Sequence, residues 1–385
     1  MDEITMVREL YGRPEPDPAV RERVRARITG ERPARRPRRR MTFGLGLVAA
    51  ATTAVIAGTN LLGGGTTGGP VVIGTAGGTA GGGDGSARTV LLAAAENAER
   101  EQPGRYWRLH TTYADTYRVK EGYNVEGNRW ESDEWTARSM DDPDHNFDRD
   151  LPSRPQTPAD EAAWRRAGSP RTWKVISSGR PHTLTTESTA WRSAITSPEQ
   201  KRSLTEVCTD GAPADSPADP ECGPLAELSG QGRVLTDPDH LKELLAQIRA
   251  RRASVLEGEP ELKKEMAARF DMPIIYGFLT QAATPEVRAE AFRLLADTPG
   301  VRSIGTVTDR AGRRGIGLAA RATRDDGGTV YDQVIILEPG TYRVLGEQKV
   351  VVKANGTHRG MAPGTVLSHT VVHQVGWTND TPAHP

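Results

Sequence analysis

The sequence predicts an α+β fold: a single transmembrane helix, then an extracytoplasmic domain with a curved antiparallel sheet and a helical insertion covering one sheet face. Three observations predict it. An uncharged apolar stretch runs from Phe43 to Leu62. Strand-like segments rich in Trp and Tyr follow within 106–194, and strand-like segments return after residue 303. A helical block separates the two groups, which is the order of elements in an α+β domain.

The first 40 residues form a basic tail. They hold 12 Arg against 7 acidic residues, a net charge of +5, so the remaining residues of this neutral chain sum to −5. An Arg cluster (residues 35–40) abuts one end of the apolar stretch, a positive-inside pattern that places the N-terminus in the cytoplasm. The zero net charge argues against a protein built for nucleic acid, and the sorting of charge along the chain indicates two compartments or a basic tail.

The apolar stretch predicts a transmembrane helix over residues 41–62. Twenty residues at about 1.5 Å each span about 30 Å, the thickness of the bilayer's hydrocarbon core. A buried core helix and a cleaved signal peptide are the alternatives. Because signal peptides have shorter apolar regions of about 7–15 residues, we interpret the segment as an uncleaved anchor in the cell membrane.

A helix predicted in the tail carries Val20, Val24 and Ile28 among arginines. It has two interpretations, a solvated basic helix near anionic headgroups or a docking helix for a cytoplasmic partner. Beyond the membrane, residues 63–86 form a glycine-rich linker. The extracytoplasmic domain is predicted over 87–380, and its first helix over Ala87 to Glu101.

The first strand group is predicted at 106–113, 116–125, 129–137, 172–176 and 184–194. Glu126-Gly127-Asn128 is interpreted as a hairpin turn. The polar, proline-rich segment 141–158 is interpreted as a loop.

The helical block begins at Asp237-Pro238, a predicted N-cap and first helical residue, followed by an apolar stripe from Leu241 to Ile248. A second helix is predicted near 261–270, and a third begins at Thr284-Pro285. Between them lies the apolar stretch 273–283.

The final strands are predicted at 304–309, 315–322, 329–337, 342–352 and 365–376. Glu338-Pro339-Gly340-Thr341 has Pro and Gly where a type II turn requires them.

The two cysteines, Cys208 and Cys222, both follow the predicted span. In an oxidising compartment they are expected to form a disulfide, and the alternative is two unrelated thiols. Their spacing fits neither a CxxC redox motif nor a zinc site.

Catalytic motifs are missing from the sequence. The eight histidines have no metal-ligand spacing, and His369 and His373 lie too far apart along a strand to share a metal ion. The glycines at 312, 315 and 317 resemble a phosphate loop, but a turn between strands explains them better. An acidic cluster within 141–150 lacks the EF-hand pattern and is interpreted as a solvated loop. We therefore predict a protein that is not an enzyme and has neither cofactor nor metal.

Two passages carry a family resemblance: MDEITMVRELYGRPEPDPAVRERVRARI with the Arg run and Ala-rich span after it, and GTVTDRAGRRGIGLAA followed by VIILEPGTYRVLGEQ. The chain resembles an actinobacterial family of uncharacterised single-pass membrane-anchored proteins, often encoded beside extracytoplasmic-function sigma factors. The resemblance implies a signalling or envelope-stress role. The HxxxCxxC zinc motif of many anti-sigma domains is missing here.

The strand–helix–strand layout is also similar to lipoprotein-carrier folds, in which a curved sheet and a helical lid enclose an apolar cavity. That similarity implies an apolar ligand against the 273–283 segment, with Ile274, Ile275, Phe278 and Leu279 as its surface.

Two functions follow from these features. The first is an envelope sensor or regulator whose tail binds a cytoplasmic protein, a sigma factor or its regulator, through residues 1–40. The second is an envelope carrier or binding protein for a lipid or other apolar ligand, in which the tail is only an anchor.

Overall fold

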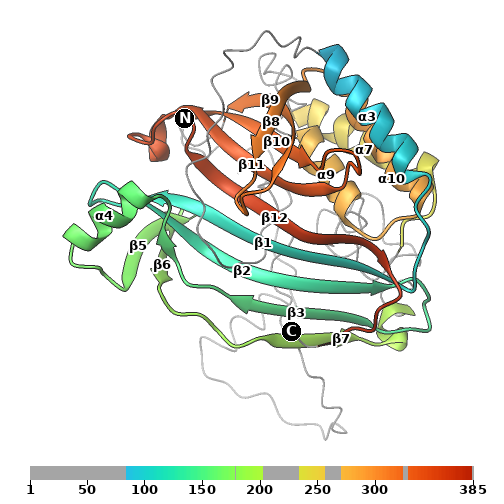
Figure 1. Cartoon of the computed structure of the whole chain (residues 1–385), viewed down its shortest axis with the longest axis horizontal. Coiled ribbons are helices and arrows are strands. Elements are labelled where there is room, and N and C mark those ends of the chain that lie inside the picture. Colours follow the sequence, from blue (N-terminus) through green and yellow to red (C-terminus); the bar gives the residue numbers. More distant parts are fainter. Residues whose placement is uncertain (1–83, 178, 203–233, 256–269, 324–327, 384–385) are drawn as a thin grey trace, which may run out of the picture. The chain divides into compact units, whose positions relative to one another are not determined.

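A computed structural model describes residues 84–177, 179–202, 234–255, 270–323 and 328–383 (Figure 1). The predicted tail, the predicted transmembrane helix, nearly all of the linker, both cysteines and the helix near 261–270 lie outside these ranges. Within them, no helix has both the length and the apolarity that a membrane crossing needs.

The described residues form an α+β fold with a mostly antiparallel sheet, as predicted. Its main sheet has ten strands, nine of them in the order β7-β3-β2-β1-β12-β11-β10-β9-β8, with β4 paired to β2 and β5-β6 forming a separate hairpin. The strands are β1 (Tyr106–Arg118), β2 (Asn124–Ala137), β3 (Asp144–Asp150), β4 (Arg154–Pro155), β5 (Thr172–Ser177), β6 (Arg180–Thr185), β7 (Arg192–Thr196), β8 (Arg302–Thr308), β9 (Arg314–Thr323), β10 (Val330–Leu337), β11 (Val344–Lys353) and β12 (Val366–Thr378). The first and last strands pair, so β1 joins the two strand groups at the centre of the sheet.

A layer of helices packs on one face of the sheet, as Figure 1 shows beside β8–β11. The helices are α3 (Asp84–Ala98), α7 (Pro238–Val255), α9 (Met272–Thr280) and α10 (Pro285–Ala296); α4 (Pro158–Arg166) and the short 3-10 helix η3 (Gly356–His358) lie elsewhere. Predicted caps are confirmed: Asp237 accepts from the Asp239 and His240 amides, and Thr284 accepts from the Val287 amide. The first helix begins at Asp84, within the predicted linker.

Both sheet faces are apolar around β10. Ile335 and Leu337 point into the core under the helices, whereas Val334 and Ile336 belong to a second cluster on the opposite face. A strand covered on both faces gives a continuous apolar run rather than an alternating one.

The sheet is strongly curved. Arg310, in the turn between β8 and β9, contacts Glu126 of β2, although five strands lie between β2 and β8 in the sheet order. The turn therefore folds over the face opposite the helices. This is the turn predicted from the glycines at 312–317, and Gly312 has the positive φ of 83° that glycine allows.

Three predictions for the first strand group are wrong. The strand predicted over 184–194 instead covers the end of β6, the connecting residues 186–191 and the start of β7. The hairpin turn lies at residues 119–123, where the Gly122 amide donates to the Val119 carbonyl; Glu126 to Asn128 lie inside β2. These turn-forming residues instead form an irregularity in the pairing of β1 with β2. The register of the two strands shifts beside them, and Asn128 has a φ of 46°. The predicted strand 116–125 is accordingly divided between β1 and β2.

The predicted loop 141–158 contains β3 and β4. β3 pairs with both β2 and β7, and Phe147 is its one buried residue. Because a strand with one buried side chain lacks apolar alternation, its sequence pattern resembles that of a loop.

Candidate functional site: a buried polar cluster between helix α9 and the sheet

The four residues predicted to form an apolar ligand surface all lie on α9. Ile274, Ile275, Phe278 and Leu279 are at most 4% exposed and belong to the core between the helices and the sheet. Pro273 near the start of the helix and an apolar sequence produce a short helix buried on almost every side. These side chains act as core packing in this structure.

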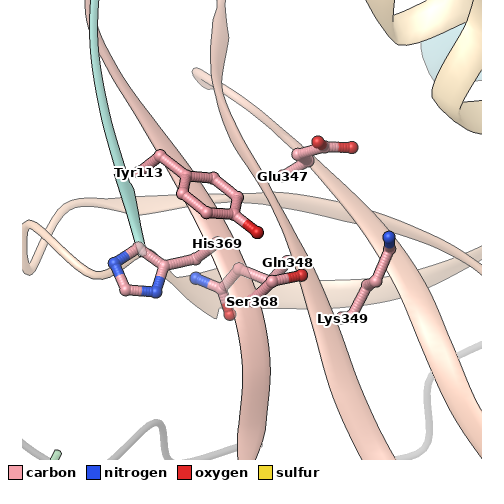
Figure 2. Close-up of a pocket in the computed structure, with 6 residues that line it drawn as sticks. All are labelled: Tyr113, Glu347, Gln348, Lys349, Ser368 and His369. Atoms are coloured by element: carbon pink, nitrogen blue, oxygen red, sulfur yellow. The ribbon is translucent and has the colours of Figure 1, made fainter. Parts of the chain in front are cut away.

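A small cavity lies beside β1, β11 and β12 (Figure 2). It is lined by Tyr113, Glu347, Gln348, Lys349, Ser368 and His369. Five of these six residues are polar or charged, and the sixth is a tyrosine. The space between these side chains is too small for a water molecule, so a ligand would enter only if the surrounding side chains moved.

Strand register brings the site together. Tyr113 of β1 stands opposite Thr370 of β12, which stands opposite Glu347 of β11. Directly opposite residues share a sheet face, so the three side chains form one row across the sheet. Gln333 of β10 completes the group: its amide Nε2 donates to Glu347 Oε2 at 2.8 Å.

Helix α9 adds Tyr276 to this row. Its hydroxyl lies near Glu347 and beside Thr370. Tyr276, Thr370 and Gln333 are only 4%, 8% and 0% exposed, and one polar atom of each lacks a hydrogen-bond partner. A buried polar atom without a partner costs about 1–3 kcal/mol. The cluster therefore gathers two hydroxyl groups and an amide oxygen near one buried carboxyl group.

The Glu347 carboxyl has an unusual proton affinity. Burial raises its pKa from 4.5 to about 7, although Lys349 and the Gln333 hydrogen bond both act to lower it. Burial also raises the pKa of Tyr276 well above its usual range, and the nearby Glu347 adds to this effect. The site thus holds a carboxyl group that loses or gains its proton near neutral pH, next to hydroxyl and amide groups that can bind a polar ligand.

His369 lines the cavity but belongs to a different environment. In Figure 2 its ring points away from the Glu347 carboxylate. It faces Glu126 and a group of arginines on the opposite side of the sheet, and burial lowers its pKa from 6.5 to about 3. His369 is therefore neutral at physiological pH.

The other predicted features have structural partners. His373 lies 3.0 Å from the Thr112 hydroxyl, and its ring centroid is 4.8 Å from that of His110. Across the described ranges, no three or more His, Cys, Asp or Glu side chains are placed to hold a metal ion. In the acidic cluster, Asp142 pairs with Arg105 at 2.8 Å and Asp144 pairs with Lys201 at 2.7 Å.

Sequence patterns did not identify Glu347, Gln333, Thr370 or Tyr276. One signal was present: Gln333 interrupts β10, whose other residues on the helix-covered face from Tyr331 to Leu337 are apolar or aromatic. A polar residue at a core position needs a partner or a function.

Comparison with protein-family models, with curated proteins and with solved structures finds no match to this chain.

Proposed function

We propose that this chain is a non-enzymatic, membrane-anchored envelope sensor or regulator linked to sigma-factor signalling. Its extracytoplasmic domain binds a small polar ligand where α9 packs on the sheet, and its basic tail, residues 1–40, binds a cytoplasmic sigma factor or regulator. The lack of a catalytic motif in the sequence supports a binding role over an enzymatic one.

The observation that carries the proposal is the gathering of three buried polar atoms, from Gln333, Thr370 and Tyr276, near Glu347. Two of them, from Gln333 and Thr370, belong to strands, and the third belongs to helix α9. A ligand that hydrogen-bonds to all three stabilises one particular placement of the helix on the sheet. Binding energy of that kind can shift a conformational equilibrium and so can carry a signal.

The alternative, a carrier for a lipid or other apolar ligand, gains less support. Five of the six residues that line the cavity are polar or charged, and the apolar side chains of α9 are already buried. An apolar ligand would require the helix layer to separate from the sheet.

Recovery of partner proteins from cells tests the signalling proposal. The full-length chain is used as bait beside a variant that lacks residues 1–30 but keeps the Arg run and residues 41–62. We expect the full chain to recover a sigma factor or its regulator and the deletion to recover neither. Equal recovery by both baits, or none by either, contradicts the proposed role of the tail.

Tyr276→Phe then tests the ligand site in the same cells. Because the hydroxyl has no partner, its removal is expected to raise the free energy of unfolding by about 1 kcal/mol. Signalling, measured as transcription dependent on the recovered sigma factor, is expected to fall at the same time. Tyr342→Phe, outside the cluster, is the control and should leave signalling unchanged. A Tyr276→Phe variant with full signalling excludes this cluster as the ligand site.

A further inference from the structure

A second charged cluster lies on the sheet face opposite the helices. Its centre is Glu126 of β2, which is fully buried. Three arginines from separate segments surround it: Arg129 of β2, Arg154 of β4 and Arg310 of the β8–β9 turn. The three guanidinium groups converge here only because the curved sheet brings the turn over β2.

These groups carry more positive than negative charge. Arg154 Nε lies 3.0 Å from Glu126 Oε2, Arg129 Nε lies 3.8 Å from the same oxygen, and Arg310 binds the other oxygen. In the described part of the chain, every ion pair of these three arginines goes to Glu126. One carboxylate therefore faces three cations, which leaves a surplus of two positive charges.

Backbone carbonyl groups accept some of the hydrogen bonds that these arginines can donate. Arg129 donates to the Pro152 carbonyl and Arg310 donates to the Gln156 carbonyl at 3.3 Å. Arg310 Nε and His369 Nδ1 are nevertheless buried without a hydrogen-bond partner. His369, uncharged at neutral pH, adds no negative charge to the balance.

Burial makes this surplus costly. The Arg129 and Arg310 side chains are almost fully enclosed, and moving an unpaired cation out of water costs several kcal/mol. Burial and the neighbouring Arg154 lower the pKa of Arg129 from 12.5 to about 10, which agrees with a site short of negative charge. Arginine forks match the oxygens of phosphate and sulfate in geometry as well as charge.

We infer that this cluster is a binding site for a small oxyanion of the phosphate or sulfate class, held by Arg129, Arg154 and Arg310. The anion supplies the missing negative charge and reaches the site beside Arg154, whose side chain is 34% exposed. It lies across the sheet from the cavity at Glu347, so it is a separate site. Because its ligands come from β2, β4 and the β8–β9 turn, the bound anion links distant parts of the sheet.

Thermal unfolding and titration calorimetry of the full 385-residue chain test the inference, with sodium phosphate compared to sodium chloride at equal ionic strength. Phosphate at about ten times its dissociation constant is expected to raise the unfolding midpoint by about 2–4 °C. Arg154→Gln removes one partly exposed ligand and is expected to abolish that rise. Arg149→Gln is the matched control, since Arg149 is 35% exposed and pairs with Glu131 outside the cluster.

A phosphate-dependent rise in the unaltered chain and in Arg149→Gln, but not in Arg154→Gln, supports the site. An equal rise in the unaltered chain and in both variants shows a general salt effect and overturns the inference. The inference is also overturned if phosphate gives the unaltered chain neither a binding heat nor a shift of the unfolding midpoint. Arg154→Lys keeps the charge but loses the fork, and is expected to bind phosphate more weakly than arginine. Glycerol phosphate in parallel distinguishes a free oxyanion from a phosphate monoester, since only a site that admits an ester binds both.

Discussion

Glu347 is the residue whose chemistry depends most directly on the fold. In the unfolded chain it is an ordinary glutamate, whereas between β11 and α9 burial raises its pKa from 4.5 to about 7. The folded state therefore holds the proton more tightly than the unfolded state between these two pH values. Stability is expected to fall as pH rises through this window, and the penalty is fully present above pH 7.

The variant Glu347→Gln should remove this pH dependence. Gln keeps an oxygen that can accept the Gln333 amide hydrogen, but it carries no charge to bury. We expect the variant to be more stable than the unaltered chain at pH 8, by on the order of 3 kcal/mol, and nearly equal to it at pH 4. Urea unfolding at both pH values measures the difference. If the stability difference between the variant and the unaltered chain is the same at pH 4 and pH 8, Glu347 ionises normally. Any remaining pH dependence would then come from the other titratable groups that face this region, Tyr113, Tyr276 and Lys349.

At the scale of elements, the β5–β6 hairpin depends on one glycine in β2. A Cβ atom on Gly127 would lie 2.5 Å from the Leu184 methyl groups, and Leu184 is buried among Val125 and Trp173. Gly127, which was predicted to lie in a turn, therefore lies in β2 at the point where β6 packs directly against the β2 backbone.

Gly127→Ala is expected to lower the free energy of unfolding by about 1–3 kcal/mol, because the buried leucine must shift. Gly277→Ala is the control: it lies in α9 with open space around the added atom, and helix propensity predicts a gain of about 0.5–1 kcal/mol. Chemical denaturation of both variants measures this contrast. If both substitutions stabilise the protein, the packing of β6 on β2 is looser than the structure shows.

At the scale of the whole described domain, two tryptophans hold the helix layer on the sheet. Trp107 of β1 donates its indole hydrogen to the Thr280 carbonyl at 2.8 Å, and Trp377 of β12 donates to the Ala283 carbonyl at 3.1 Å. Both carbonyls lie at the end of α9 or just beyond it. The buried Arg288 of α10 also lies over the Trp107 ring, at 4.8 Å.

Trp107→Phe is expected to destabilise the domain by about 1–3 kcal/mol, since it leaves the Thr280 carbonyl unpaired in the core. Amide hydrogen exchange in α9 should accelerate more than exchange in β2 and β3. Trp191→Phe is the control, because Trp191 packs with Arg149 near the other edge of the sheet. Uniform acceleration across the domain, or the same pattern in both variants, would show that Trp107 does not specifically anchor the helices.

Much of the secondary structure was predictable because it depends on local chemistry. The α10 helix follows from Thr284, Pro285 and an apolar stripe, and the turn at Glu338 to Thr341 follows from its proline and glycine. The hydrogen bonds and steric limits behind these predictions act between residues only a few positions apart. The α+β class follows in turn from the order of such elements.

The other features of the fold and the candidate site depend on contacts between distant segments of the chain. β3 is a strand because β2 and β7 supply its hydrogen bonds, and the turn-like residues at Gly127 form part of β2 because the long strand pairing outweighs a local preference. The candidate site has the same origin: Tyr113 meets Glu347 through the register of β1 with β12 and of β12 with β11. Pairing between distant strands leaves no periodic signal in the sequence. Local patterns therefore predict the elements and their class, whereas the sheet register places these polar groups together in the core.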